Sequence, residues 1–232
     1  MGIVERKERE KERRRDEIIE AARKVFFEKG PVAATMDEFA EVAELSKATL
    51  YLHFPSKEDL FLAVAMEGLR TLHGGFLEII THESSVVRAL HRMKNAYMDF
   101  FRSHRHYVQM FSYLQMSQFH KQVSEQMRAS CDSENDKHWE AIINLLRRGV
   151  EQKIIRDDID PTEMAIVLWT NASSLMLRAD NENDMWKRRR NIDLHKTMET
   201  SFRMTIDAIL TPAARLEYQA MLQNERALVH QS

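Results

Sequence analysis

The sequence has little of what disulfide, metal or membrane chemistry requires. A single cysteine, Cys131, excludes an internal disulfide and a cysteine-rich metal site. Only 6 glycines and 4 prolines occur in 232 residues, and helix-forming residues are plentiful, so long helices with few turns are expected. No apolar run is long enough to cross a bilayer, and the charged N-terminus is unlike a secretory signal. We therefore expect an all-α protein of the cytoplasm with no membrane partner.

Catalytic signatures are also missing. The chain contains no HExxH element, no Glu-x-x-His element, no GxSxG element and no glycine-rich phosphate loop. Asp157, Asp158 and Asp160 lack the glycine and the terminal glutamate of a calcium loop, so helix capping explains them better. His104 and His106 are the only closely spaced histidines, which is too little for a metal site. We expect no enzyme activity, no cofactor and no metal.

Residues 35–57 carry the most informative pattern. Thr35 and Glu38 form a capping box, which predicts that a short helix starts there. Ser46 offers a second N-cap, and Pro55 ends the helix that follows it. Two short helices with so small a gap predict a helix-turn-helix, whose second helix fits a DNA major groove about 12 Å wide.

A third helix start follows directly. Ser56 and Asp59 form a weaker cap, which places Lys57 in the first turn, where the helix dipole favours phosphate. From residue 16 to residue 60 acids outnumber bases, so DNA affinity must come from charges sorted onto one face, with Lys47 and Lys57 toward phosphate.

These residues resemble the head of the TetR family of bacterial transcriptional regulators, over roughly residues 14–64. The matching positions hold a fixed register: Ile19, Ala21, Ala22, Phe26, Gly30, Thr35, Phe39, Ala40, Ala43, Ser46, Thr49, Leu50, Tyr51, His53, Phe54, Ser56, Lys57 and Leu60. The resemblance implies an N-terminal three-helix DNA-binding domain and a larger C-terminal helical domain for ligand binding and dimerisation. The expected DNA-binding residues are Thr35, Ser46, Lys47, Ala48, Thr49, Tyr51, His53 and Lys57.

The chain departs from the family pattern at three positions. Glu44 stands where glycine is usual, and a non-glycine residue in a left-handed turn costs roughly 1–2 kcal/mol. Either the turn is remodelled here or the strain is tolerated. Ala48 also replaces a frequent glycine, and Leu52 occupies a variable position. Base preference therefore cannot be inherited from a relative.

Four segments are expected along the chain. Residues 1–15 form a charged arm or helix extension, residues 16–62 the DNA-binding domain, residues 63–211 the effector-binding and dimerisation domain, and residues 212–232 a polar tail that could form a helix. The segment 5–15 is basic on balance and has two interpretations. It is either an arm that enters a minor groove or, as the interleaved glutamates favour, a solvated extension of the first helix.

Beyond the head the pattern is generic and helical. Gly74 and Gly75 are expected to weaken or break the helix that starts at Ser56. Asp160 and Pro161 start a long apolar helix. The basic cluster 187–190 is expected in a loop between helices. Further helices are expected over 86–101, 107–119, 139–150 and 194–209.

The resemblance also implies a homodimer. In TetR-like proteins the last two helices of the larger domain pair with their twins in a four-helix bundle, and two recognition helices on a two-fold axis read a palindrome. The expected interface residues are Leu168, Ala172, Leu175, Met198, Phe202 and Ile209.

Bulky residues in the middle helices raise the question of a ligand. Ordinary core packing explains any one of them. The resemblance adds the alternative of a largely apolar effector site. Its expected lining is Tyr97, Phe101, Phe111, Tyr113, Met116, Phe119, Trp139, Trp169 and Met176. The effector itself is not identified by the sequence.

Together these features predict a homodimeric, effector-responsive transcriptional regulator of the repressor type. The alternative is a DNA-binding protein that is controlled by a protein partner, or that acts architecturally, without a small-molecule effector. An enzyme or carrier on a helical bundle is disfavoured, because the catalytic constellations are missing.

Overall fold

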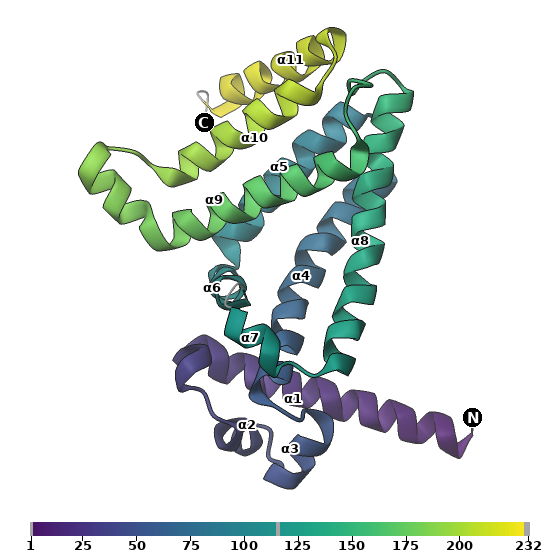
Figure 1. Cartoon of the computed structure of the whole chain (residues 1–232), viewed down its shortest axis with the longest axis vertical. Helices are drawn as coiled ribbons and strands as arrows, with labels where there is room; N and C mark the ends of the chain where they lie inside the picture. The colour runs from purple at the N-terminus through teal and green to yellow at the C-terminus, as the bar shows by residue number, and fades with distance from the viewer. Residues whose placement is uncertain (1, 115–116, 230–232) are drawn as a thin grey trace. The chain divides into compact units, whose positions relative to one another are not determined.

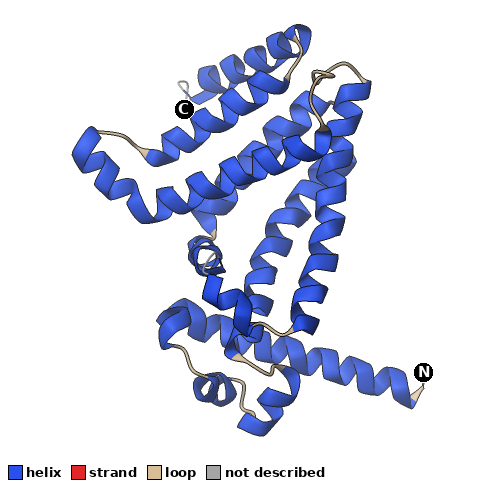
Figure 2. Cartoon of the chain, in the orientation of Figure 1, coloured by secondary structure: helices blue, strands red, loops and turns tan. Residues whose placement is uncertain are grey.

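The computed structural model describes residues 2–114 and 117–229, and this part is all-α, as predicted (Figures 1 and 2). No strand occurs in these ranges, where Ile155 and Leu210 form an isolated bridge. None of the described helices combines the length and apolar character needed to span a bilayer. The helices are α1 (Ile3–Ala33), α2 (Met36–Val42), α3 (Lys47–His53), α4 (Lys57–His82), α5 (Val86–Ser103), α6 (Arg105–Leu114), α7 (Ser117–Gln122), α8 (Glu125–Glu151), α9 (Pro161–Arg190), α10 (Leu194–Ile209) and α11 (Pro212–Val229).

The chain forms two compact units. The head comprises Met1–Arg70 and Gln109–Ser133, and the second unit comprises Thr71–Val108 and Glu134–Ser232. The head therefore takes in α6 residues from Gln109 onward, α7 and the start of α8, which no sequence pattern had assigned to it. The expected functional division into residues 16–62 and 63–211 stays a prediction.

The head is built around aromatic side chains. The Phe26 ring lies 4.7 Å from that of Phe39 and 5.2 Å from that of Phe61, measured between centroids. Phe61 also contacts Tyr113 and Phe119, at 5.2 and 5.4 Å. Because these side chains come from α1, α2, α4, α6 and α7, their burial ties the segment 109–133 to the DNA-binding elements.

The predicted break at Gly74 and Gly75 is wrong, because α4 continues to His82. A glycine inside a helix costs about 1 kcal/mol relative to alanine, which does not end a helix whose other face is packed. Leu72 and Ile79, on either side of the pair, are both buried. Tertiary packing therefore overrides the local preference.

The second unit has its own apolar core. Val87 on α5, Leu146 on α8, Ile209 on α10 and Tyr218 on α11 are almost completely buried in one cluster. The C-terminal segment is therefore a packed helix, whose Tyr218 anchors it against α5.

The cluster 187–190 lies in the last turn of α9, so its expected position in a loop is wrong. The C-terminal turn of a helix favours cations, because the helix dipole is negative there. Asn191 then ends the helix in the left-handed conformation, with φ 53°. The four basic residues thus belong to a helix end.

Candidate DNA-binding site

The first helix of the motif is capped as predicted. The Thr35 hydroxyl accepts a hydrogen bond from the Glu38 amide at 3.4 Å, and the Glu38 carboxylate accepts one from the Thr35 amide at 2.9 Å. α2 buries Met36, Phe39 and Ala40 against the rest of the head. This packing fixes the direction from which the chain enters the turn.

The turn between α2 and α3 keeps the left-handed geometry without a glycine. Glu44 has φ 54°, and the Leu45 amide donates to the Ala40 carbonyl at 2.9 Å, which closes the end of α2. The turn is therefore not remodelled. It keeps the left-handed conformation and tolerates the strain, which costs roughly 1–2 kcal/mol.

α3 is anchored on one side and exposed on the other. The Ser46 hydroxyl accepts from the Thr49 amide at 3.1 Å, which confirms the N-cap, and the two hydroxyl oxygens lie 2.8 Å apart. Leu50 is completely buried, whereas Lys47 and Ala48 are exposed. The helix is thus held by its inner side and presents its outer side to a partner.

The two lysines expected at phosphate have different surroundings. The Lys47 ammonium is exposed and pairs with the Asp37 carboxylate at 2.6 Å, a bond that raises the pKa of Lys47. Lys57 donates to the carbonyls of Pro31, Val32 and Ala34, at 2.9, 3.3 and 3.1 Å. Lys57 therefore closes the C-terminal end of α1, and Lys47 remains on the outer face.

The far end of α3 lies beside the N-terminal part of α1. Tyr51 is exposed and His53 is half-buried. Burial lowers the pKa of His53, and the charges of Lys11, Arg14 and Arg15 lower it further. The Arg15 guanidinium also lies over the Phe54 ring, 5.1 Å from its centroid. No pattern in the sequence had indicated this neighbourhood.

The residues expected to line an effector site are divided between the two compact units. Phe111, Tyr113 and Phe119 belong to the head. The remaining described residues lie in the second unit. The Tyr97 hydroxyl donates to the Met176 sulfur at 3.3 Å, and burial raises the pKa of Tyr97.

Other members of this set have neighbours of their own. Phe101 is buried beside the His195 ring, at 5.3 Å between centroids. The Trp139 and Trp169 rings meet edge to face at 5.7 Å, and Trp169 is 53% exposed. Met116 lies outside the described residues.

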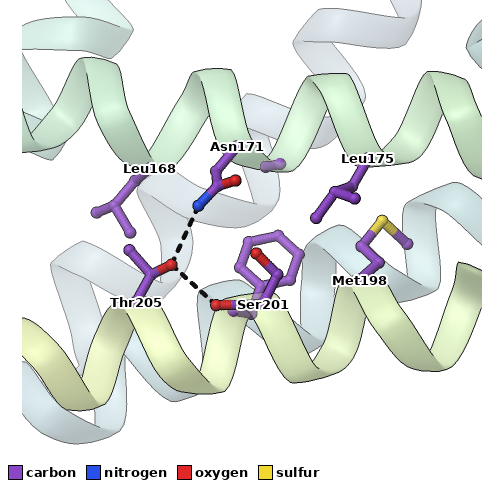
Figure 3. A pocket seen from close by; sticks show the side chains of 8 residues that line it. Leu168, Asn171, Leu175, Met198, Ser201 and Thr205 are labelled. Atoms are coloured by element: carbon purple, nitrogen blue, oxygen red, sulfur yellow. Dashed lines mark hydrogen bonds between the residues drawn. The ribbon is translucent and has the colours of Figure 1, made fainter.

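α9 and α10 pack together along most of α10 and leave a shallow groove between them (Figure 3). Its outer rim carries a hydrogen bond from the Asn171 amide to the Thr205 hydroxyl, at 3.2 Å. The groove has no room for a water-sized molecule. Its lining is Leu168, Asn171, Ala172, Leu175, Met198, Ser201, Phe202 and Thr205.

The groove contains five of the six residues expected at a subunit interface, and the sixth, Ile209, is buried in the core of the second unit. Met198 and Ala172 are buried as well. These three side chains hold α9 and α10 together from within. Any surface for a partner is left to the exposed residues on the outer side of the two helices.

Residues 18–64 match the family model described as bacterial regulatory proteins of the tetR family. The chain is 28% identical over 149 residues to the HTH-type transcriptional repressor KstR2 of Mycobacterium tuberculosis, covering 63% of this chain and 72% of the relative. It is 36% identical over 90 residues to the transcriptional activator FasR of Mycolicibacterium smegmatis, covering 39% and 41% of the two chains.

A solved structure shares the architecture over most of its length. The TetR-family regulator PfmR of Thermus thermophilus superposes with a TM-score of 0.58 at 25% identity, covering 82% of this chain and 96% of PfmR. The capped α2, the left-handed turn and the exposed α3 occupy the part of the sequence that the family model matches. Residues 18–64 therefore form a DNA-binding head of the TetR-family type, on a chain that shares the fold of a TetR-family transcriptional regulator.

Proposed function

We propose that the protein is a homodimeric repressor, which binds a palindromic operator in double-stranded DNA and releases it when a small, largely apolar effector binds. The observation that carries the proposal is the outer side of α3, where Lys47, Ala48 and Tyr51 are exposed on a helix anchored by Leu50. A helix of 7 residues covers few base pairs, so two copies on a two-fold axis are needed to read a full site. Repression follows KstR2, the relative with the longer match.

The outer side of α9 and α10 supplies a surface for the second copy. Ile166 and Val167 on α9 and Met204 on α10 are between 48% and 65% exposed. Val167 lies one turn before Asn171, and Met204 precedes Thr205, so both flank the hydrogen bond on the rim of the groove. Exposed apolar side chains gathered on a helix pair are typical of a subunit interface.

Met204→Glu tests this interface. A two-fold axis would bury two added carboxylates, and unpaired buried charges cost several kcal/mol, so the variant should sediment as a monomer and bind operator DNA weakly. Leu216→Glu is the matched control, because Leu216 is 69% exposed on α11, a helix that contributes no residue to the groove between α9 and α10. Equal effects of the two variants, or a dimeric Met204→Glu protein, would contradict the interface.

Footprinting on DNA from the protein's own promoter region tests the regulator. We expect protection of two half-sites whose centres lie about 34–36 Å apart or a multiple of that distance, with two protomers bound per site. Protection of one half-site by a single protomer would contradict the homodimeric interpretation.

The effector site is proposed around Tyr97, whose buried hydroxyl has only the weak sulfur acceptor of Met176 among the described residues. Its apolar surroundings include Phe202, at 5.4 Å between ring centroids. A ligand with one acceptor group and an apolar body would improve this hydrogen bond. A thermal-shift screen should find a compound that adds about 2.7 kcal/mol at 100 times its dissociation constant. Tyr97→Phe should weaken the binding of that compound without changing the affinity for DNA.

A second candidate is control by a protein partner, or an architectural role. One observation favours it, since the groove that Phe202 lines next to Tyr97 has no room for a water-sized molecule. In that case the protein binds DNA with the same footprint, and no small molecule in the screen changes its stability or its affinity for DNA.

A further inference from the structure

The first helix extends well beyond the part that the family model matches. The match begins at residue 18, whereas α1 begins at Ile3 (Figure 1). At 1.5 Å per residue, the 15 residues before the match add about 22 Å of helix. The extension is therefore long enough to reach past the neighbouring α3.

One stripe of this extension is basic. Lys7, Lys11 and Arg14 follow each other at spacings of four and three residues, which place them on one face of the helix. The same spacing continues to Ile18 and Ala22, which are completely buried in the head. The basic stripe thus prolongs the line along which α1 faces the rest of the head.

The acidic residues of the extension lie to either side of this stripe. The best-paired of them, Glu10 and Glu17, bind Arg13 at 2.6 and 3.0 Å. Arg14 pairs with Glu17 at 2.9 Å. Within the described residues neither Lys7 nor Lys11 forms an ion pair, and both are exposed. Two cations of the stripe are therefore available to an external anion.

Two observations place the stripe beside the end of α3. The Arg15 guanidinium lies over the ring of Phe54, the residue that follows α3. Lys11, Arg14 and Arg15 act electrostatically on His53, the last residue of α3. A polyanion that meets the outer side of α3 would therefore continue toward Lys11 and Lys7.

We propose that Lys7 and Lys11 bind the phosphate backbone of double-stranded DNA that flanks the half-site contacted by α3. The inference rests on the proposed function and deepens it. Phosphate contacts carry no sequence information, so the extension adds affinity and salt dependence and lengthens the footprint, without changing base preference.

The test compares two double variants with equal charge. Lys7→Gln/Lys11→Gln removes the stripe, and Arg6→Gln/Arg9→Gln removes the same charge from the other side of the same helix. Glutamine forms helices about as well as lysine and arginine, and far-UV circular dichroism checks the helix content. Each protein is titrated across a salt series with two duplexes, one with long flanks and one trimmed to the half-sites.

On the long duplex, the stripe variant should bind roughly tenfold more weakly, and the slope of log affinity against log salt should fall by about 0.9 for each phosphate that the variant no longer neutralises. The affinity and salt slope of the control variant should stay near those of the wild type, and trimming the duplex should remove the difference between the two variants.

Equal affinities and salt slopes of both variants and the wild type on the long duplex would overturn this proposal alone. Equal weakening by both variants would also overturn it, because net charge would then suffice. Failure of the wild type to bind promoter DNA in the presence of competitor would overturn the proposed function, and this inference with it.

Discussion

The two compact units differ in how their buried polar groups are hydrogen-bonded. In the head, the nearly inaccessible Asp59 carboxylate accepts a hydrogen bond from the Ser124 amide at 2.7 Å, and Lys57 satisfies three carbonyls. In the second unit, the Nδ1 atoms of His73 and His104 are buried without a hydrogen-bond partner among the described residues. Buried polar atoms are nearly always paired in folded proteins. Asp59 and Lys57 therefore have their hydrogen bonds within the head, whereas the second unit holds imidazole nitrogens to which a proton or a ligand could still bind.

The largest expected effect is acid destabilisation of the second unit. Burial, helped by the neighbouring His138, lowers the pKa of His73 from 6.5 to about 4, although Glu134 raises it slightly. The unfolded chain therefore takes up a proton before the folded one does. Stability should be unaffected above pH 6.5 and should fall by at most about 3 kcal/mol between pH 6.5 and pH 4.

Urea unfolding followed by tryptophan fluorescence measures this effect, because Trp139, Trp169 and Trp186 all lie in the second unit. The variant His73→Leu is the comparison, since it removes the imidazole and its unpaired nitrogen. Its unfolding midpoint should vary much less over the same pH range. A midpoint with the wild-type pH dependence would show that another group is responsible.

The next effect belongs to the head. Lys57→Met should cost about 2 kcal/mol, because the carbonyls of Pro31, Val32 and Ala34 lose a charged donor. Far-UV circular dichroism reports both units, so its transition should shift while the tryptophan transition stays in place. Lys47→Met is the matched control, because Lys47 has only an exposed ion pair, which is worth about 0–1 kcal/mol. The comparison between the units fails if Lys57→Met shifts both transitions equally.

A smaller effect should raise the stability of the head. Glu44→Gly relieves the left-handed strain at φ 54° and should stabilise the head by up to about 1 kcal/mol, after the entropy cost of glycine. Ala48→Gly, four residues further on and inside α3, should destabilise it by a similar amount. Thermal unfolding followed by circular dichroism distinguishes the two signs. Destabilisation by both variants would mean that the turn is not strained.

The sequence predicted those features of the fold that depend on local chemistry. The caps at Thr35 and Ser46, and the start of α9 at Asp160, need only residues within one turn of each other, and all three are present. The continuation of α4 through Gly74 and Gly75 depends on packing from distant residues, so local preference led to the wrong answer.

The candidate site shows the same limit. Lys47 and Lys57 look alike in sequence, since each occupies the first turn of a helix. Only the folded chain brings the end of α1 to Lys57, 23–26 residues away. The aromatic residues of the middle helices likewise share a periodicity, but periodicity does not specify which unit they join. Phe119, for example, packs in the head, whereas Tyr97 packs in the second unit.

The most direct test of the central claim is fluorescence anisotropy on DNA from the protein's own promoter region, across a salt series and with unrelated DNA as competitor. The wild type should bind saturably and resist the competitor. Lys47→Ala should bind more weakly with a salt slope lower by about one per protomer, whereas Asp37→Asn should bind more tightly, because it frees Lys47 from its ion pair and removes a negative charge. Binding that the competitor abolishes equally, or an unchanged slope for Lys47→Ala, would contradict recognition of DNA through the start of α3.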